Sequence, residues 1–249
     1  MEIIKDILKF GCAETFYKYN PEANDTVCAI VGFVCFLLCI VIAYLLGSIN
    51  FAIILSKLRG EDIREHGSKN AGTTNMLRTY GKKAAVLTLV GDFLKGTVAV
   101  LIGMLLAGVL GQYLAALFAV LGHVFPVYYK FKGGKGIATA AGTILACEPI
   151  VLLILVIIFA LVVACTKYVS LASVMVALLY PVLLDRYYKF IGAPSGLHLL
   201  FVIILSCIVV WKHWPNIQRL VNKTESKISF KKKSAVEKKS DEEGSGDDE

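Results

Sequence analysis

The sequence predicts an all-α integral membrane protein with seven transmembrane helices. Hydrophobic residues make up 57% of the 249 residues, against roughly 45–50% apolar residues in an ordinary soluble domain. They gather in long runs, and about 20 apolar residues let one helix cross roughly 30 Å of hydrocarbon. The net charge of +7 is carried by a few polar segments between the runs and by the tail.

The first expected transmembrane helix comprises residues 27–56, which contain no charged residue. This run is longer than the apolar part of a signal peptide, so we expect it to remain in the mature protein. Residues 1–26, which carry mixed charge, are then an N-terminal extracytoplasmic extension. The next run, from about Ala84 to Tyr129, is interrupted by Asp92 and Lys95 and is too long for one crossing. We expect it to fold back near residues 108–111 into helices two and three.

Residues 137–166 are also too long for one perpendicular helix, and Glu148-Pro149 forms a polar break inside them. Two helices or one tilted helix both fit this run. Further helices are expected at about 168–184 and 190–211.

The distribution of positive charge decides between six and seven helices. With seven, segments 57–83 and 130–135, Lys167 and the lysine-rich tail share one side, which the positive-inside rule makes cytoplasmic. With six, the tail would lie opposite the two basic loops. Arg186 and Lys189 are exceptions in the seven-helix arrangement and fall outside. The membrane domain then comprises 27–225, and the charged tail 226–249 is expected to be disordered.

Three polar segments would meet at this cytoplasmic face. The first, DIREHGSKNAGTTNMLRTYGKK at 62–83, is dense in hydroxyl, amide and backbone N–H donors, and its Arg78 offers a planar fork suited to phosphate. The second, YYKFKGGKGIATAAG at 128–142, places three glycines and Lys135 before an expected helix start, where free N–H groups favour an anion. It lacks the spacing of a Walker A loop, so ATP binding is not expected.

The third segment, KHWPNIQRLVNKTE at 212–225, spaces His213, Asn216 and Arg219 three residues apart, so on a helix they share one side. An interfacial helix end would explain Trp211 and Trp214, but it explains the His and Asn less well.

Ionisable residues inside the membrane are candidates for function. Asp92 and Lys95 are three residues apart and are also placed to pair with each other, which we favour. His123 fits structural support and substrate contact equally well. The four histidines are scattered and no cysteines form a CxxC pair, so no metal site is expected. A basic soluble domain with interleaved aromatic residues is absent, so nucleic acid is not an expected partner.

The three segments together resemble the bacterial acyl-phosphate:glycerol-3-phosphate acyltransferases, the PlsY family, from about Leu46 to Glu225. The pattern GSxN-x-G-x-x-N-x-x-R begins at Gly67, and G-H-x-x-P-x-x-x-x-F-K-G-G-K-G is complete from Gly122 to Gly136. The third motif ends with Thr224 and Glu225. Three residues depart from the family pattern: Lys69 and Lys223 stand where glycine is usual, and Trp214 where arginine is usual.

The resemblance implies a multi-pass enzyme of the bacterial plasma membrane with its N-terminus outside and its C-terminus cytoplasmic. It would transfer a fatty acyl group from acyl phosphate to the sn-1 hydroxyl of glycerol 3-phosphate, without a cofactor, giving lysophosphatidate and phosphate. Membrane lipids surround it, and a soluble acyl-phosphate synthase would supply the donor. By resemblance, glycerol 3-phosphate is bound by Ser68, Arg78, His213 and Asn216, and acyl phosphate by Lys135, Gly133, Gly134 and Gly136. Asn70, Asn75, Lys132 and Arg219 are further candidates for substrate binding.

Two other activities fit part of the pattern. An anion or phosphate transporter would use the same basic segments, but no duplicated halves are visible in the sequence. A lipid-binding scaffold leaves the dense Gly, Asn and Lys pattern unexplained. A His-x4-Asp pair, usual in acyl-CoA-dependent glycerolipid acyltransferases, is absent, which favours acyl phosphate as the donor.

Overall fold

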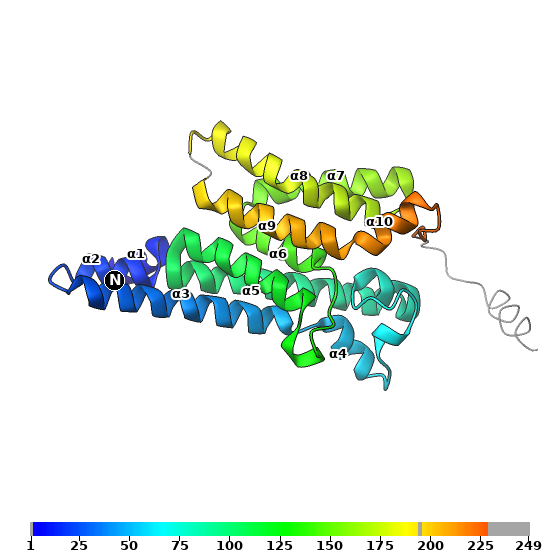
Figure 1. Ribbon diagram of the computed structural model, residues 1–249, viewed down its shortest axis with the longest axis horizontal. Coiled ribbons are helices and arrows are strands. Elements are labelled where there is room, and N and C mark those ends of the chain that lie inside the picture. Colours follow the sequence, from blue (N-terminus) through cyan, green and yellow to red (C-terminus); the bar gives the residue numbers. More distant parts are fainter. Residues whose placement is uncertain (1, 194–195, 229–249) are drawn as a thin grey trace, which may run out of the picture.

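In the computed structural model, residues 2–193 and 196–228 are described, and their regular structure is helical throughout (Figure 1). The tail is predicted to be disordered from residue 226, and its residues from 229 onward lie outside the described part. Four described helices are long and apolar enough to cross a membrane, and a fifth is added if α9 and α10, which are bent by 54°, are counted as one. Helix α5, counted once here, is itself folded back.

Helix α3 (Asp25–Ser48) is capped by Asn24, whose side chain accepts a hydrogen bond from the backbone N–H of Thr26 at 2.9 Å. It ends earlier than the predicted run. The following helix, α4 (Phe51–Lys57), is separate because the Asn50 side chain caps it by accepting from the N–H of Ile53 at 3.1 Å. The predicted helix 27–56 is therefore a membrane-length helix followed by a short second helix.

The backbone of helix α5 (Thr73–Val124) leaves helical geometry at two places, first at Gly81 and then at Ala107 and Gly108. The chain reverses at the second place, which divides α5 into two antiparallel halves. This confirms the predicted fold-back. The two halves approach closely at Gly103 and Gly111: a Cβ on Gly111 would lie 2.2 Å from the carbonyl oxygen of Gly103. Only glycine fits at this contact without moving backbone.

The predicted break at Glu148-Pro149 is confirmed, since α6 (Ile137–Cys147) and α7 (Pro149–Thr166) are separate helices. Proline at the first helical position needs no N–H partner, so it begins α7 without loss. The chain continues through the remaining helices, α8 (Val169–Phe190), α9 (Gly196–Lys212) and α10 (Trp214–Val221).

The N-terminal residues form two short helices, α1 (Glu2–Phe10) and α2 (Cys12–Tyr19), packed against the turn of α5. Backbones touch there: a Cβ on Gly11 would lie 2.4 Å from the N of Gly108. The extension therefore covers the end of the bundle at which α5 folds back (Figure 1).

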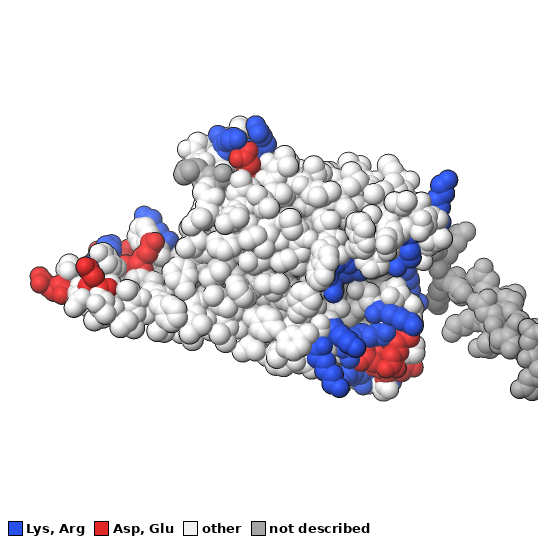
Figure 2. Space-filling model, in the orientation of Figure 1, with Lys and Arg blue, Asp and Glu red and all other residues white. Residues whose placement is uncertain are grey.

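Charged side chains gather at the two ends of the molecule, and a broad band between them carries almost none on the visible face (Figure 2). Large apolar side chains in this band face outward; Phe33, Leu153 and Leu178 are each more than half exposed. An outward-facing apolar band suits lipid rather than water. The fold is that of a multi-pass membrane protein.

Candidate functional site

The three polar segments meet at one end of the bundle. The guanidinium of Arg64 donates to the carbonyl oxygens of Tyr129 and Lys132, each at 3.2 Å, and joins the first segment to the second. The guanidinium of Arg78 donates to the carbonyl oxygen of Ser226 at 3.1 Å and joins the first segment to the residues after α10. These bonds connect parts of the chain up to 148 residues apart.

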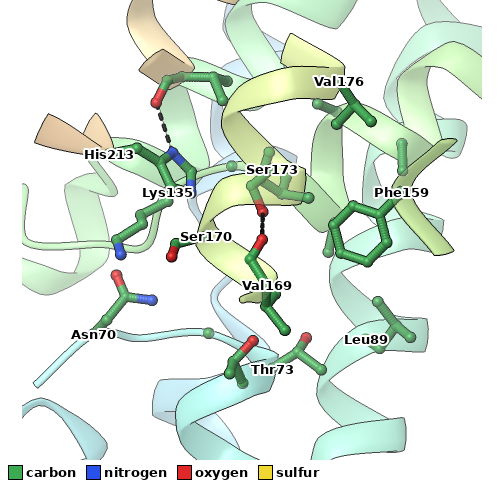
Figure 3. Close-up of a pocket in the computed structure, with 18 of the residues that line it drawn as sticks. Asn70, Thr73, Leu89, Lys135, Phe159, Val169, Ser170, Ser173, Val176 and His213 are labelled. Atoms are coloured by element: carbon green, nitrogen blue, oxygen red, sulfur yellow. Dashed lines mark hydrogen bonds between the residues drawn. The ribbon is translucent and has the colours of Figure 1, made fainter. Parts of the chain in front are cut away.

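A cavity of about 1170 Å³ opens between the segments and continues among the helices. Its polar end is lined by candidate residues from all three segments, and beyond them its walls are apolar side chains of α5, α6, α7 and α8 (Figure 3). The predicted site residues that line it are Ser68, Asn70, Asn75, Arg78, Lys135, Gly136, His213, Asn216 and Arg219.

Asn75 shapes the first segment. Its buried side chain accepts a hydrogen bond from the N–H of Ser68 at 2.9 Å and donates to the carbonyl oxygens of Ile63, His66 and Asn70 at 2.9 to 3.2 Å. One amide thus holds the loop closed over several residues. This leaves Ser68 and Asn70 at the cavity wall.

Two helices begin at the cavity. Thr73 starts α5 after Gly72, and Ile137 starts α6 after Gly136, and all four residues line the cavity. Gly136 has φ +88°, a backbone region that side chains rarely adopt. The first N–H groups of a helix have no partner within it, and with the helix dipole they favour anions.

Lys135 lies between these two helix starts, with its ammonium directed toward the Asn70 side chain in Figure 3. Its Nζ donates to the side-chain oxygen of Asn216. Burial, together with the positive charges of Arg219 and Arg78, lowers the pKa of Lys135 to about 8. An anion at this point would restore the preference for the charged form.

Glu225 fastens the third segment. Its carboxylate accepts from Asn216 Nδ2 at 2.7 Å, from Ser170 Oγ at 2.8 Å and from Arg219 Nε at 2.7 Å. Burial by itself would raise the pKa of Glu225, but these hydrogen bonds more than offset it and hold the pKa below its usual value. The preceding turn forms despite the missing glycine, since Lys223 adopts φ +59°.

His213 is buried at the junction of α9 and α10, and its Nδ1 lies 2.8 Å from the carbonyl oxygen of Val209. Burial lowers the pKa of His213 to about 4, so the ring is neutral. Because a carbonyl oxygen only accepts, Nδ1 carries the proton and Nε2 keeps a free lone pair.

Three predicted residues are not among the described residues that line the cavity. Lys132 is exposed, while Gly133 and Gly134 pack their loop against the end of α5. A Cβ on Gly134 would lie 2.2 Å from Nε2 of His123. Close packing therefore requires glycine at both positions. Substrate contact by Lys132, Gly133 and Gly134 stays a prediction.

The intramembrane ionisable residues form a buried cluster under this loop. Lys95 Nζ lies 2.8 Å from Asp92 Oδ1 and 2.9 Å from His123 Nδ1, and it also donates to the carbonyl oxygen of Ile49. The predicted pairing of Asp92 with Lys95 is confirmed. Since His123 supports Gly134, the cluster ties α4, both halves of α5 and the glycine loop together.

The sequence reasoning missed Ser170 and Ser173, which line the cavity from the first turns of α8. Their spacing of three in the otherwise apolar first half of α8 was the available signal. Glu225 belongs to the third motif, but its contacts with Asn216, Ser170 and Arg219 follow only from the fold. Among the described residues, no group of three or more potential metal ligands comes together.

Comparisons with known proteins agree with this geometry. The family model described as "Glycerol-3-phosphate acyltransferase" matches residues 37–223. Curated relatives named glycerol-3-phosphate acyltransferase include one from Bacillus subtilis, 43% identical over 78% of this chain and 97% of that protein. Another, from Coxiella burnetii, is 44% identical over 78% of this chain and 99% of that protein.

Solved structures show the same fold. The crystal structure of PlsY, an integral membrane glycerol 3-phosphate acyltransferase, in its glycerol 3-phosphate form has a TM-score of 0.72 at 36% identity and covers 78% of this chain and 96% of that chain. Its lysophosphatidic acid form has a TM-score of 0.69. The motifs, the fold and the relatives agree, and the chain belongs to the glycerol-3-phosphate acyltransferase family.

Proposed function

We propose that this enzyme takes its fatty acyl group from acyl phosphate and transfers it to the sn-1 hydroxyl of glycerol 3-phosphate, at the cavity described above. The observation that carries the proposal is the division of this one cavity into a cationic, donor-rich end and an apolar channel. Two phosphates and one hydrocarbon chain need such a combination. A soluble synthase would supply the acyl phosphate.

Each helix start at the cavity would receive one phosphate. The glycerol 3-phosphate site comprises Ser68 and Arg78 near the start of α5, facing His213 and Asn216. The acyl phosphate would place its phosphate at Lys135 and the start of α6, because that helix leads directly into the apolar walls.

In the reaction the sn-1 hydroxyl oxygen attacks the carbonyl carbon of the mixed anhydride. The new ester C–O bond forms, the bond from carbonyl carbon to phosphate oxygen breaks, and phosphate leaves with the electron pair. Lys135 and the N–H groups of α6 stabilise the negative charge that develops on this phosphate. The hydroxyl proton goes to a substrate phosphate oxygen, and the protein mainly aligns the two reactants.

We further propose seven membrane passages, with residues 1–26 outside and the site on the cytoplasmic side. The support is the fold-back of α5, the break between α6 and α7, and the cationic segments gathered around the cavity. Residues 27–225 would then be the catalytic membrane domain.

The test is lysophosphatidate formation by the purified protein in lipid, with palmitoyl phosphate or palmitoyl-CoA as donor. We expect turnover with palmitoyl phosphate alone, and a fall of at least about a hundredfold in Lys135→Ala and Arg78→Ala, since each removes a charge-assisted phosphate contact. Lys83→Ala, an exposed lysine outside the cavity lining, is the matched control and should keep full activity.

Turnover with palmitoyl-CoA instead would overturn the donor assignment. No turnover with either donor by folded protein would contradict the proposal and lead to phosphate-uptake assays. Equal activity in all three variants would mean that the reaction takes place at another site.

A further inference from the structure

The apolar part of the cavity has a defined inner end. On α8, the residues that line it lie on one face and finish at Tyr180. On α6 they finish at Ile144, and on α7, which runs the opposite way, they finish at Leu152. All three belong to one buried cluster and are at most 9% exposed. Three helices therefore close the cavity at the same depth.

Tyr180 is the largest side chain at this closure and is held in place from behind. It is 4% exposed, and its hydroxyl lies 3.4 Å from a carboxylate oxygen of Glu148, at the break between α6 and α7. The same cluster includes Tyr113, whose hydroxyl lies 2.9 Å from that of Tyr188 and whose ring stacks on His198 at 4.8 Å. The hydroxyl of Tyr180 is thus directed to the Glu148 carboxylate, and Tyr180 also lines the cavity.

The depth of the channel matches one hydrocarbon chain. Ser170, which bonds to Glu225 at the polar end, and Tyr180 are ten residues apart on α8, about 15 Å at about 1.5 Å per residue. Half of a hydrocarbon core roughly 30 Å thick is the same length, and this is the depth filled by the chains of one leaflet. A chain with its head at Lys135 would bring its methyl end to the Tyr180 ring.

We propose that Tyr180 sets the length of acyl chain that this enzyme transfers best. The inference rests on the proposed function. A longer chain must displace the ring or bend outward between α5 and α7, where Leu94 and Val156 are about half exposed. The selection is therefore graded rather than absolute.

The experiment is a competition in which one enzyme sample receives glycerol 3-phosphate and an equimolar mixture of saturated acyl phosphates, from dodecanoyl to eicosanoyl. Mass spectrometry measures the ratio of lysophosphatidate products. This ratio is independent of the fraction of enzyme that is folded. Tyr180→Ala should shift the product ratio toward longer chains. Burying one methylene is worth about fourfold at most, and neighbouring even-numbered chains differ by two methylenes, so we expect a shift of about tenfold between them.

Tyr180→Trp should move the ratio toward shorter chains, and Tyr180→Phe, which keeps the ring, should leave it within about twofold of the wild type. Tyr187→Ala, the same change on the same helix but outside the cavity lining, is the control and should not move it. The KM for glycerol 3-phosphate should stay constant in all four variants.

An unchanged ratio in both Tyr180→Ala and Tyr180→Trp overturns the proposal and means that the chain leaves the channel sideways. If Tyr180→Ala does not fold, an unchanged product ratio in Tyr180→Trp is sufficient to overturn the proposal. Absence of every product in the wild type contradicts the proposed donor and not the role of Tyr180, so the two failures are distinguishable.

Discussion

At the scale of single residues, hydrogen bonds hold several polar groups of the site in one orientation. Asn75 closes the first loop, Glu225 holds Asn216 and Arg219, and Val209 fixes the tautomer of His213. Lysine stands in place of two family glycines, and Lys223 adopts the left-handed backbone that glycine favours. The backbone at Lys223 therefore keeps the turn before Glu225 without glycine.

We expect Lys135 to give the activity an alkaline limit. Its pKa of about 8 in the free protein means that the ammonium is charged below pH 8 and loses its proton above it. In the proposed function the charged form binds the phosphate of the donor, so kcat/KM should fall as pH rises through about 8. The pH dependence of kcat/KM reports groups of the free enzyme. Lys135→Arg should retain partial activity and move this limb beyond the measurable range, since arginine stays protonated. An identical alkaline limb in Lys135→Arg would exclude Lys135 as its source.

At the scale of elements, the site depends on helices that approach more closely than side chains allow. The halves of α5 meet at Gly103 and Gly111, α3 meets α5 at Gly47, and α6 meets α5 at Gly142, where a Cβ would lie 1.9 Å from the carbonyl oxygen of Phe93. Small residues at helix contacts let backbones approach where no hydrophobic effect joins helices in lipid. The contact at Gly142 joins α6, which begins at the cavity, directly to α5.

Gly111→Ala should therefore reduce the yield of folded protein and its thermal stability, because the new methyl group meets backbone that cannot move away. The matched control is Gly32→Ala on α3, where a Cβ meets nothing within 4 Å. Tm values from fluorescence-detected size exclusion after heating would compare them, with a loss of several degrees expected only for Gly111→Ala. Equal Tm values would mean that the α5 halves are farther apart than described.

At the scale of the whole molecule, charge and apolar surface fix how the protein sits in the bilayer. The uncharged band separates two charged ends, and the end with the cavity also carries the cationic loops (Figure 2). Soluble glycerol 3-phosphate and the proposed acyl phosphate would meet at such a boundary. The proposed function thus accounts for a polar pocket and an apolar channel in one cavity.

The proposed orientation is tested with Lys5→Cys and Lys223→Cys, each in a background without the seven native cysteines. A membrane-impermeant maleimide applied to intact cells should label Lys5→Cys, and Lys223→Cys should react only after the cells are opened. The reverse pattern would place the site outside. Labelling of both in intact cells would contradict an odd number of passages.

The sequence by itself determined the family motifs, the fold-back of α5 and the break at Glu148-Pro149, because run length and local backbone preference express them directly. It also predicted the candidate residues of the polar pocket. Only the tertiary structure decided that Asn50 ends the first long helix run, that Gly133 and Gly134 pack against the end of α5, and that Ser170 and Glu225 meet. These depend on contacts between distant segments. The position of Tyr180 at the inner end of the channel also depends on the fold, in which α6, α7 and α8 end the channel together.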